Sequence, residues 1–249
     1  MLTAERQRVI LELLNEHQTV KLKEITDATG ASDSTIRRDL DFLERAGKLR
    51  RIHGGASLRR PASEEPSMVE KSSKFYEEKK SIGRAAAELV QDGECIYIDA
   101  GSTTFEMIQY LADKNITAVT NGLSHLNALT ELRIPTYIIG GYIKERTRAV
   151  IGAMAVDSLK QFRFDQCFMG VNGITIEHGF TTPDPEEAAV KRTALSLSLK
   201  KYFVTDASKF GEVSFSQIAE IDEAHIVTNE KGQLLDPYKK KTKIKVVTS

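Results

Sequence analysis

A capped turn that leads into a short helix constrains this chain more than any other feature. The stretch GASDSTIRRDL begins at Gly30, a residue suited to the left-handed end of a preceding helix. Ser32 can cap the next helix by accepting a free backbone N–H of its first turn. Ile36, Leu40 and Leu43 recur at i, i+4 and i+7, so one face packs while another carries hydroxyl and guanidinium groups. The pattern predicts the turn and reading helix of a helix-turn-helix, which lies on DNA.

The neighbouring residues predict the rest of such a domain. Thr3 can cap an amphipathic first helix that carries Val9, Ile10, Leu13 and Leu14, and Leu22, Ile25 and Ala28 indicate a short second helix. A basic strand from residue 48 runs into Gly54 and Gly55, which is typical of a tight hairpin. Three helices and a basic hairpin make a winged helix-turn-helix over residues 1–57. Its expected contacts with double-stranded DNA are Ser32, Ser34, Thr35, Arg37, Arg38, Arg50, Arg51 and His53. The alternative is a small three-helix structural unit whose arginines are only solvated.

Charge is distributed unevenly along the 249 residues, although 35 basic and 35 acidic side chains balance overall. Residues 1–60 hold twelve Lys and Arg against nine Asp and Glu, a net charge of +3, and the remainder carries −3. A basic head on an acidic body fits a DNA-reading module joined to a domain that does not touch DNA.

Cysteine content and hydropathy predict a cytoplasmic protein. Cys95 and Cys167 are far apart and each stands in an apolar setting, which favours two buried thiols over a disulfide or a metal site. The N-terminal residues form an amphipathic pattern rather than a signal peptide. The chain contains no run of about 18 apolar residues, so we expect no membrane span.

Two prolines, several serines and mixed charges over residues 58–74 indicate a linker. The chain from 75 to 249 then alternates apolar strands with helices, which predicts an α/β domain with an open, mostly parallel sheet. Helices are expected at 82–90, 104–111, 123–129 and 186–199. Strands are expected at 95–98, 117–120, 136–139, 166–170, 201–205 and 225–227.

Small polar residues gather where these strands end, and ligands of such sheets lie beyond the carboxyl ends of the strands. The first strand ends in DAGSTT, whose hydroxyl groups and free N–H groups can cradle an anion at a helix start. The later ends supply Asn and Asp for sugar hydroxyls and a lysine for a phosphate. The predicted effector residues are Asp99, Gly101, Ser102, Thr103, Thr104, Thr120, Asn121, Gly140, Gly141, Gly170, Asn172, Gly173, Glu187, Lys191, Asp206 and Lys209.

Each of these residues also has a simpler interpretation. The Gly-Ser-Thr-Thr turn can be a plain strand-to-helix connection, Asp206 can cap a turn, and Lys209 can be solvated. Lys191 follows Glu187 by one helical turn, so an i, i+4 ion pair is its simplest role.

The chain resembles the DeoR family of bacterial sugar-metabolism regulators along essentially its full length. The residues that carry the resemblance are Arg6, Ile10, Leu14 and Ser32 to Leu40 in the head, and the strand-end motifs of the body. The resemblance implies a sensor domain similar in fold to ribose-5-phosphate isomerase, and a repressor released from its operator by a phosphorylated sugar. Residues 53–57, 70–74 and 99–107 look most like the fructose-operon repressors, which implies fructose 1-phosphate as inducer. Tagatose 6-phosphate or another sugar phosphate is the alternative.

Three functional classes follow from these observations. The first is a ligand-gated repressor that acts as a homo-oligomer, a dimer or tetramer, and requires no cofactor or metal beyond its sugar-phosphate effector. The second is a sugar-phosphate isomerase with a DNA-binding head, in which Glu186, Glu187 or Asp206 would be the base. The third is an activator that uses the same residues.

Overall fold

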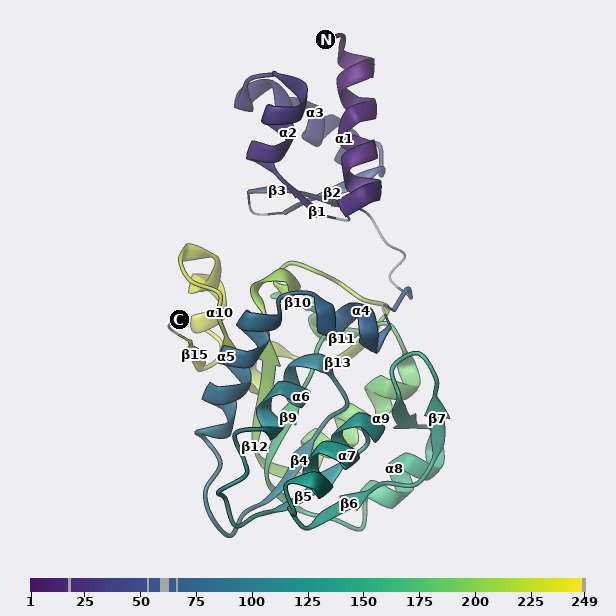
Figure 1. Ribbon diagram of the computed structural model, residues 1–249, viewed down its shortest axis with the longest axis vertical. Coiled ribbons are helices and arrows are strands. Elements are labelled where there is room, and N and C mark those ends of the chain that lie inside the picture. Colours follow the sequence, from purple (N-terminus) through teal and green to yellow (C-terminus); the bar gives the residue numbers. More distant parts are fainter. Residues whose placement is uncertain (18, 53, 59–62, 66, 248–249) are drawn as a thin grey trace. The chain divides into compact units, whose positions relative to one another are not determined.

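The computed structural model describes residues 1–17, 19–52, 54–58, 63–65 and 67–247, and His53 lies outside these ranges. The chain divides into two compact units, Met1–Pro61 and Ala62–Ser249 (Figure 1). Among the described residues, no helix combines the length and the apolar character needed to cross a membrane.

The first unit packs three helices against a small antiparallel sheet. Ile10, Leu14, Ile36, Leu40 and Leu43 are buried in one hydrophobic core, as the helical spacing predicts. Its elements are α1 Thr3–His17, β1 Thr19–Lys21, α2 Leu22–Thr29, α3 Asp33–Arg45, β2 Leu49–Ile52 and β3 Gly55–Leu58. The strand β1 was not predicted; it pairs with β3 and extends the hairpin to a sheet of order β1-β3-β2.

The Gly30 and Ser32 caps and the hairpin of this unit confirm local predictions, whereas Thr3, expected to cap the first helix, is the first residue of α1. Gly30 ends α2 with φ +67°, and its N–H bonds the Thr26 carbonyl. The Ser32 hydroxyl accepts the N–H of Thr35 at 3.4 Å and so caps α3. Gly55 tolerates no side chain, because a Cβ there would stand 2.1 Å from the Val20 carbonyl oxygen. Gly54, with φ +79°, therefore permits the tight turn of the hairpin, and Gly55 permits the close approach of β1.

The second unit is built on a parallel sheet of seven strands, ordered β15-β14-β12-β9-β4-β5-β6. Its strands are β4 Cys95–Ile98, β5 Thr117–Thr120, β6 Thr136–Ile138, β9 Phe164–Met169, β12 Ser198–Thr205, β14 His225–Thr228 and β15 Ile244–Val246. Its helices are α4 Met68–Ser73, α5 Tyr76–Ala87, α6 Ser102–Ile108, α7 Leu123–Glu131, α8 Ala153–Leu159, α9 Pro185–Ser196 and α10 Asp236–Lys239. The chain builds the sheet outward in one direction from β4 and then in the other from β9, so the strand order reverses between these two strands.

Alternate residues of the central strands enter two separate hydrophobic cores. Ile96 and Ile98 pack with α5, α6 and α7, whereas Tyr97, Cys167 and Met169 pack with α8 and α9. The helices therefore cover both faces of the sheet (Figure 1), which confirms the predicted α/β class.

Two small antiparallel sheets, neither of them predicted, accompany the main one. The first pairs β7 Tyr142–Lys144 with β8 Ala149–Ile151. The second joins β10 Gly173–Thr175, β11 Gly179–Thr182 and β13 Ser216–Ala219.

Several local predictions differ from the structure, among them the helix expected over 82–90, which is α5 Tyr76–Ala87. The expected linker 58–74 contains helix α4, because Ser67 and Glu70 form a capping box at its start. The helix expected over 186–199 ends at Ser196, because β12 begins at Ser198 and pairs with β9. Cys167 is buried, but Cys95 is exposed at the first position of β4, so the expectation of two buried thiols was wrong.

Candidate functional site

A buried ion pair lies where the strand order reverses. Asp99 follows β4 and Gly170 follows β9, and the Gly170 N–H donates to the Asp99 carboxylate at 3.0 Å. The Lys191 ammonium, from α9, bonds the same carboxylate oxygen and the Gly170 carbonyl at 3.1 Å. Burial raises the pKa of Asp99, and Lys191 opposes that rise. Such a reversal of strand order is where open α/β sheets bind ligands.

The turn after β4 presents the start of α6 beside this pair. Gly101 is the N-cap of α6, and Ser102 and Thr103 are buried in its first turn. The Thr104 hydroxyl is engaged within the protein, because it bonds the carbonyls of Asp99 at 2.6 Å and Gly101 at 2.9 Å and lies 3.1 Å from His125 Nε2. Thr104 therefore shapes the turn, and Ser102 and Thr103 are the hydroxyl residues left for a ligand.

Thr120 and Asn121, after β5, hold the same turn in place. The Thr120 hydroxyl donates to the Ile98 carbonyl at 2.7 Å. The Asn121 side chain accepts the Ala100 N–H at 2.7 Å and donates to the Val150 carbonyl at 3.3 Å. Both side chains are buried, and these contacts occupy the Asn121 carbonyl and one of its amide hydrogens.

Four of the predicted effector residues, Gly140, Gly141, Asn172 and Gly173, make no described contact with the Asp99 carboxylate. Gly140 and Gly141 connect β6 to β7, and the Gly140 N–H donates to Ser158 Oγ at 3.3 Å. The Asn172 N–H donates to the Thr181 carbonyl at 3.0 Å, and its side chain accepts from Thr182. Gly173 is a packing glycine, because a Cβ there would stand 2.4 Å from the Glu212 carbonyl oxygen.

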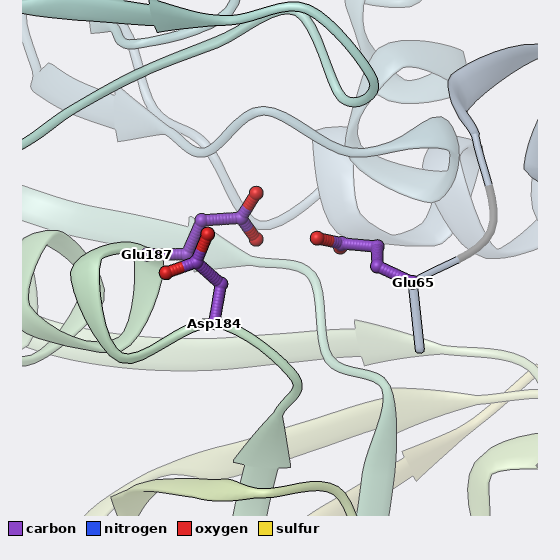
Figure 2. A group of neighbouring side chains, drawn as sticks. All are labelled: Glu65, Asp184 and Glu187. Carbon is purple, nitrogen blue, oxygen red and sulfur yellow. The ribbon is translucent and has the colours of Figure 1, made fainter. Parts of the chain in front are cut away.

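Glu187 does not pair with Lys191, so the i, i+4 ion pair, the simpler alternative for Lys191, is absent from the contacts that the structure describes. Its carboxylate accepts from Thr147 at 2.8 Å and from Lys144 at 3.1 Å, because Lys191 reaches Asp99 instead. Figure 2 shows the Glu187 and Glu65 carboxylates turned toward each other, with Asp184 beside Glu187.

Lys144 occupies the centre of this group, whose carboxylate oxygens lie within 4.8 Å of one another. Its ammonium is 2.5 Å from Glu65, 2.6 Å from Asp184 and 3.1 Å from Glu187. The Lys144 ammonium thus occupies the position between the three carboxylates that a divalent cation would otherwise take. Burial lowers the pKa of Lys144, but Glu187, Asp184 and Glu65 raise it above its ordinary value.

Asp206 and Lys209 stand at the end of β12. The buried Asp206 carboxylate accepts the Ser208 N–H at 2.9 Å and caps the 3-10 helix Ala207–Lys209, which is its simpler interpretation. Lys79 of α5 lies within electrostatic range of both Asp206 and Lys209. Burial lowers the pKa of Lys79 to about 8, and Asp206 opposes that shift.

Several charged or polar side chains at these sites were missed from the sequence, among them Glu65, Lys79, His125, Lys144 and Asp184. Glu65 and Lys144 are 79 residues apart in the chain, and His125 lies 21 residues from Thr104, so their contacts could not be read from local motifs. The one sequence signal was the capping box at 67–70, which could have revealed α4 and the docked segment before it.

In the first unit, α3 offers a polar face for DNA. Ser32, Ser34, Arg37 and Arg38 are exposed and Thr35 is half-buried, all on or beside the helix that Ser32 caps. The opposite face is anchored to α1, because the buried Asp39 carboxylate bonds Arg6 and accepts from Gln7 at 3.4 Å.

The wing arginines differ in their contacts. The Arg51 guanidinium forms an ion pair with Asp41 of α3, and its backbone N–H donates to Glu44 at 2.7 Å. Arg50 is half-buried on the same strand, and the predicted contact His53 lies outside the described residues. The Arg51 contacts tie β2 to the helix expected to read DNA.

Two family models match the chain. The DeoR-like helix-turn-helix domain matches residues 6–61, and the DeoR C-terminal sensor domain matches residues 74–230. Similar proteins cover nearly the whole length. An uncharacterized HTH-type transcriptional regulator named FruR, from Bacillus subtilis, is 47% identical over 99% of both chains. The lactose phosphotransferase system repressor of Staphylococcus epidermidis is 34% identical over 98% of both.

Among solved structures, ribose 5 phosphate isomerase A from Neisseria gonorrhoeae is similar with a TM-score of 0.41 and 21% identity. The match covers 55% of this chain and 53% of that chain.

Proposed function

This chain belongs to the DeoR family of transcriptional regulators, and on that basis we propose that it represses a sugar-utilisation operon and is released from DNA by a phosphorylated sugar. The observation that carries the proposal is the 47% identity, over 99% of both chains, to a protein named as a transcriptional regulator. The second named relative, a repressor of a lactose phosphotransferase system, supports repression and a sugar-linked signal.

The first unit supports the DNA-binding half of the proposal. An exposed row of Ser34, Arg37 and Arg38 on a capped helix suits hydrogen bonds to base edges and phosphates in a major groove. A homo-oligomer in the cytoplasm would place two such helices on repeated half-sites.

The second unit supports the effector half. The α6 N-terminus carries Ser102 and Thr103, and the backbone N–H groups of a helix start suit a phosphate. Asp99 and Lys191 lie beside it and suit sugar hydroxyls and a negative charge respectively. Lys209, at the end of β12, supplies a further cation.

Fructose 1-phosphate is the proposed inducer, from the resemblance of residues 53–57, 70–74 and 99–107 to the fructose-operon repressors. The test is fluorescence anisotropy of a labelled fragment of the gene's own upstream region. A fall in anisotropy on adding micromolar fructose 1-phosphate, absent with fructose, supports repressor and inducer together. Release by tagatose 6-phosphate alone would transfer the proposal to that effector. A fragment that never binds contradicts the repressor.

The relatives are named as regulators, and we propose that this chain is likewise not an enzyme. Two of the three base residues weighed for isomerisation are engaged, since Glu187 pairs with Lys144 and Asp206 caps a turn, and the third, Glu186, is exposed at the start of α9. Incubation of the pure protein with pentose and hexose phosphates, followed by NMR, tests this statement. Isomer formed above the protein-free background would overturn it.

A further inference from the structure

The described residues 63–65, which precede α4, are fastened to the rest of the second unit by a buried charge. Glu65 is 5% exposed, and its carboxylate accepts from Lys71 at 2.7 Å and from Lys144 at 2.5 Å. The Met68 N–H, at the start of α4, donates to the Arg146 carbonyl at 3.0 Å. Side-chain and backbone contacts thus dock this segment on the turn between β7 and β8.

The other end of α4 is held by a second buried charge. Lys79 of α5 is 4% exposed, and its ammonium bonds the carbonyls of Lys71 and Lys74, the second at 2.8 Å. These carbonyls close the C-terminal turn of α4, where a cation is favourable. Helix α4 also contacts α6, whose first turn carries Ser102 and Thr103. Helix α4 is therefore packed beside the candidate effector site.

Lys144 joins this segment to α9. The same ammonium that holds Glu65 also pairs with Asp184 and Glu187, the N-cap and first turn of α9. Asp184, Glu187 and Lys191 follow at i, i+3 and i+7, so they share one face of that helix. One rigid helix therefore connects the Lys144 cluster at its start with the Asp99 pair two turns later.

The charges in the cluster do not balance. Three carboxylates, from Glu65, Asp184 and Glu187, face two ammonium groups, from Lys71 and Lys144. Burial, and next the charge of Glu65, raise the pKa of Glu187 above its ordinary value. Burial raises the pKa of Glu65, but Lys71 and Lys144 lower it below its ordinary value, so Glu65 stays charged and docked in the free protein. A displacement of α9 would carry Asp184 and Glu187 with it and change the partners of Lys144.

We propose that the Glu65–Lys144 ion pair is a latch that couples the effector site to the segment next to the DNA-binding unit, and that a sugar phosphate opens it by drawing Lys191, and α9 with it, away from its position in the free protein. The part of this proposal that concerns the effector rests on the proposed function. In the closed state α4 stays docked. Opening frees Glu65 and α4, which lie near the start of the second unit. By linkage, breaking the latch must weaken operator binding and tighten sugar-phosphate binding.

Hydrogen exchange of the α4 amides in the full-length protein tests the latch without any ligand. Glu65→Gln removes the charge and keeps the shape, and the exposed Glu145→Gln, next to Lys144, is the matched control. We expect exchange at 68–73 to rise by about fivefold or more in Glu65→Gln, and to stay at the wild-type rate in the control. Equal rates in the two variants would overturn the latch. If Glu65→Gln fails to fold, Glu65→Asp, whose shorter side chain cannot reach both lysines, replaces it with the same expectation.

Coupling to the effector site is tested by adding Asp99→Asn, which keeps the acceptor for the Gly170 N–H. We expect this variant to raise exchange at 68–73 as well, and the double variant to show less than the combined increase of the two single ones. Independent, fully additive effects would overturn the coupling. Fructose 1-phosphate and operator titrations of the same samples report on the proposed function. A wild-type protein that binds neither contradicts that function, while the exchange cycle, which needs no ligand, still decides on the latch.

Discussion

The Lys191 ammonium bonds the Asp99 carboxylate across the boundary between β4 and β9, and both side chains are almost wholly buried. Each charge neutralises the other, because either one buried without its partner would lower the free energy of unfolding. The pair links helix α9 to the turn that precedes α6. It is the only described ion pair between α9 and the strand ends of the main sheet.

Removing the lysine should therefore destabilise the second unit strongly. Lys191→Met leaves Asp99 charged, buried and without its cation, which costs about 3–5 kcal/mol of unfolding free energy. Urea unfolding measures this cost. Lys160→Met, at an exposed lysine paired with Asp157, is the control and should change stability by less than about 1 kcal/mol. A loss in Lys191→Met no larger than that of the control would contradict the assigned pair.

Stability should fall with acid through His125. Burial, and next the charge of Lys191, lower the pKa of this imidazole to about 3. Between pH 6.5 and 3 the unfolded chain binds a proton on this side chain that the folded protein does not. The stabilisation present above pH 6.5 is therefore lost as the pH falls, by about 2 kcal/mol between pH 7 and pH 5.

Denaturant unfolding at the two pH values, for wild type and His125→Gln, isolates this contribution. The variant should show the smaller loss of stability, since glutamine does not titrate. Identical losses in the two proteins would show that His125 is not buried and neutral.

Arg38→Ala should lower operator affinity by about tenfold or more without changing the fold, because Arg38 is exposed on the helix proposed to read DNA. Anisotropy titration of the upstream fragment measures the affinity, and circular dichroism measures the fold. Arg8→Ala, on the exposed face of α1, is the matched control. An unchanged titration in Arg38→Ala would rule out α3 as the reading helix.

The β2–β3 hairpin should contribute to DNA affinity through contacts with backbone phosphates. Replacing Arg50 and Arg51 together should reduce the slope of log affinity against log salt by about two units, one for each phosphate contact. Arg51 must exchange Asp41 for a phosphate to contribute its share. A slope that stays at the wild-type value would place both arginines away from the DNA backbone.

Local chemistry explains which parts of the fold could be predicted. Gly30, Ser32 and the Gly54–Gly55 pair dictate their own backbone, so the caps and hairpin were predicted correctly. Apolar runs such as 95–98 and 117–120 are strands in the structure with the same bounds. The short strands β1, β7 and β8 were missed, because three residues carry too little periodicity to be recognised.

The candidate site was harder to predict, because its contacts join residues far apart in the chain. Asp99 and Lys191 were both identified as site residues, yet nothing in their neighbourhoods indicated that they pair with each other. The simplest role considered for Lys191 was an ion pair with Glu187, one helical turn away, and that pairing was wrong. Glu65 lay in an expected linker, so its burial against Lys144 could not be anticipated.

The central claim is that a sugar phosphate binds at the strand ends and controls the DNA-binding unit. Calorimetric titration of fructose 1-phosphate into wild type and Lys209→Ala, with operator affinity measured alongside, tests it most directly. We predict that Lys209→Ala weakens sugar-phosphate binding by about tenfold or more while operator affinity stays at the wild-type value, because a charge-assisted contact to the phosphate is lost. Unchanged binding of fructose 1-phosphate in Lys209→Ala would contradict this placement of the effector phosphate.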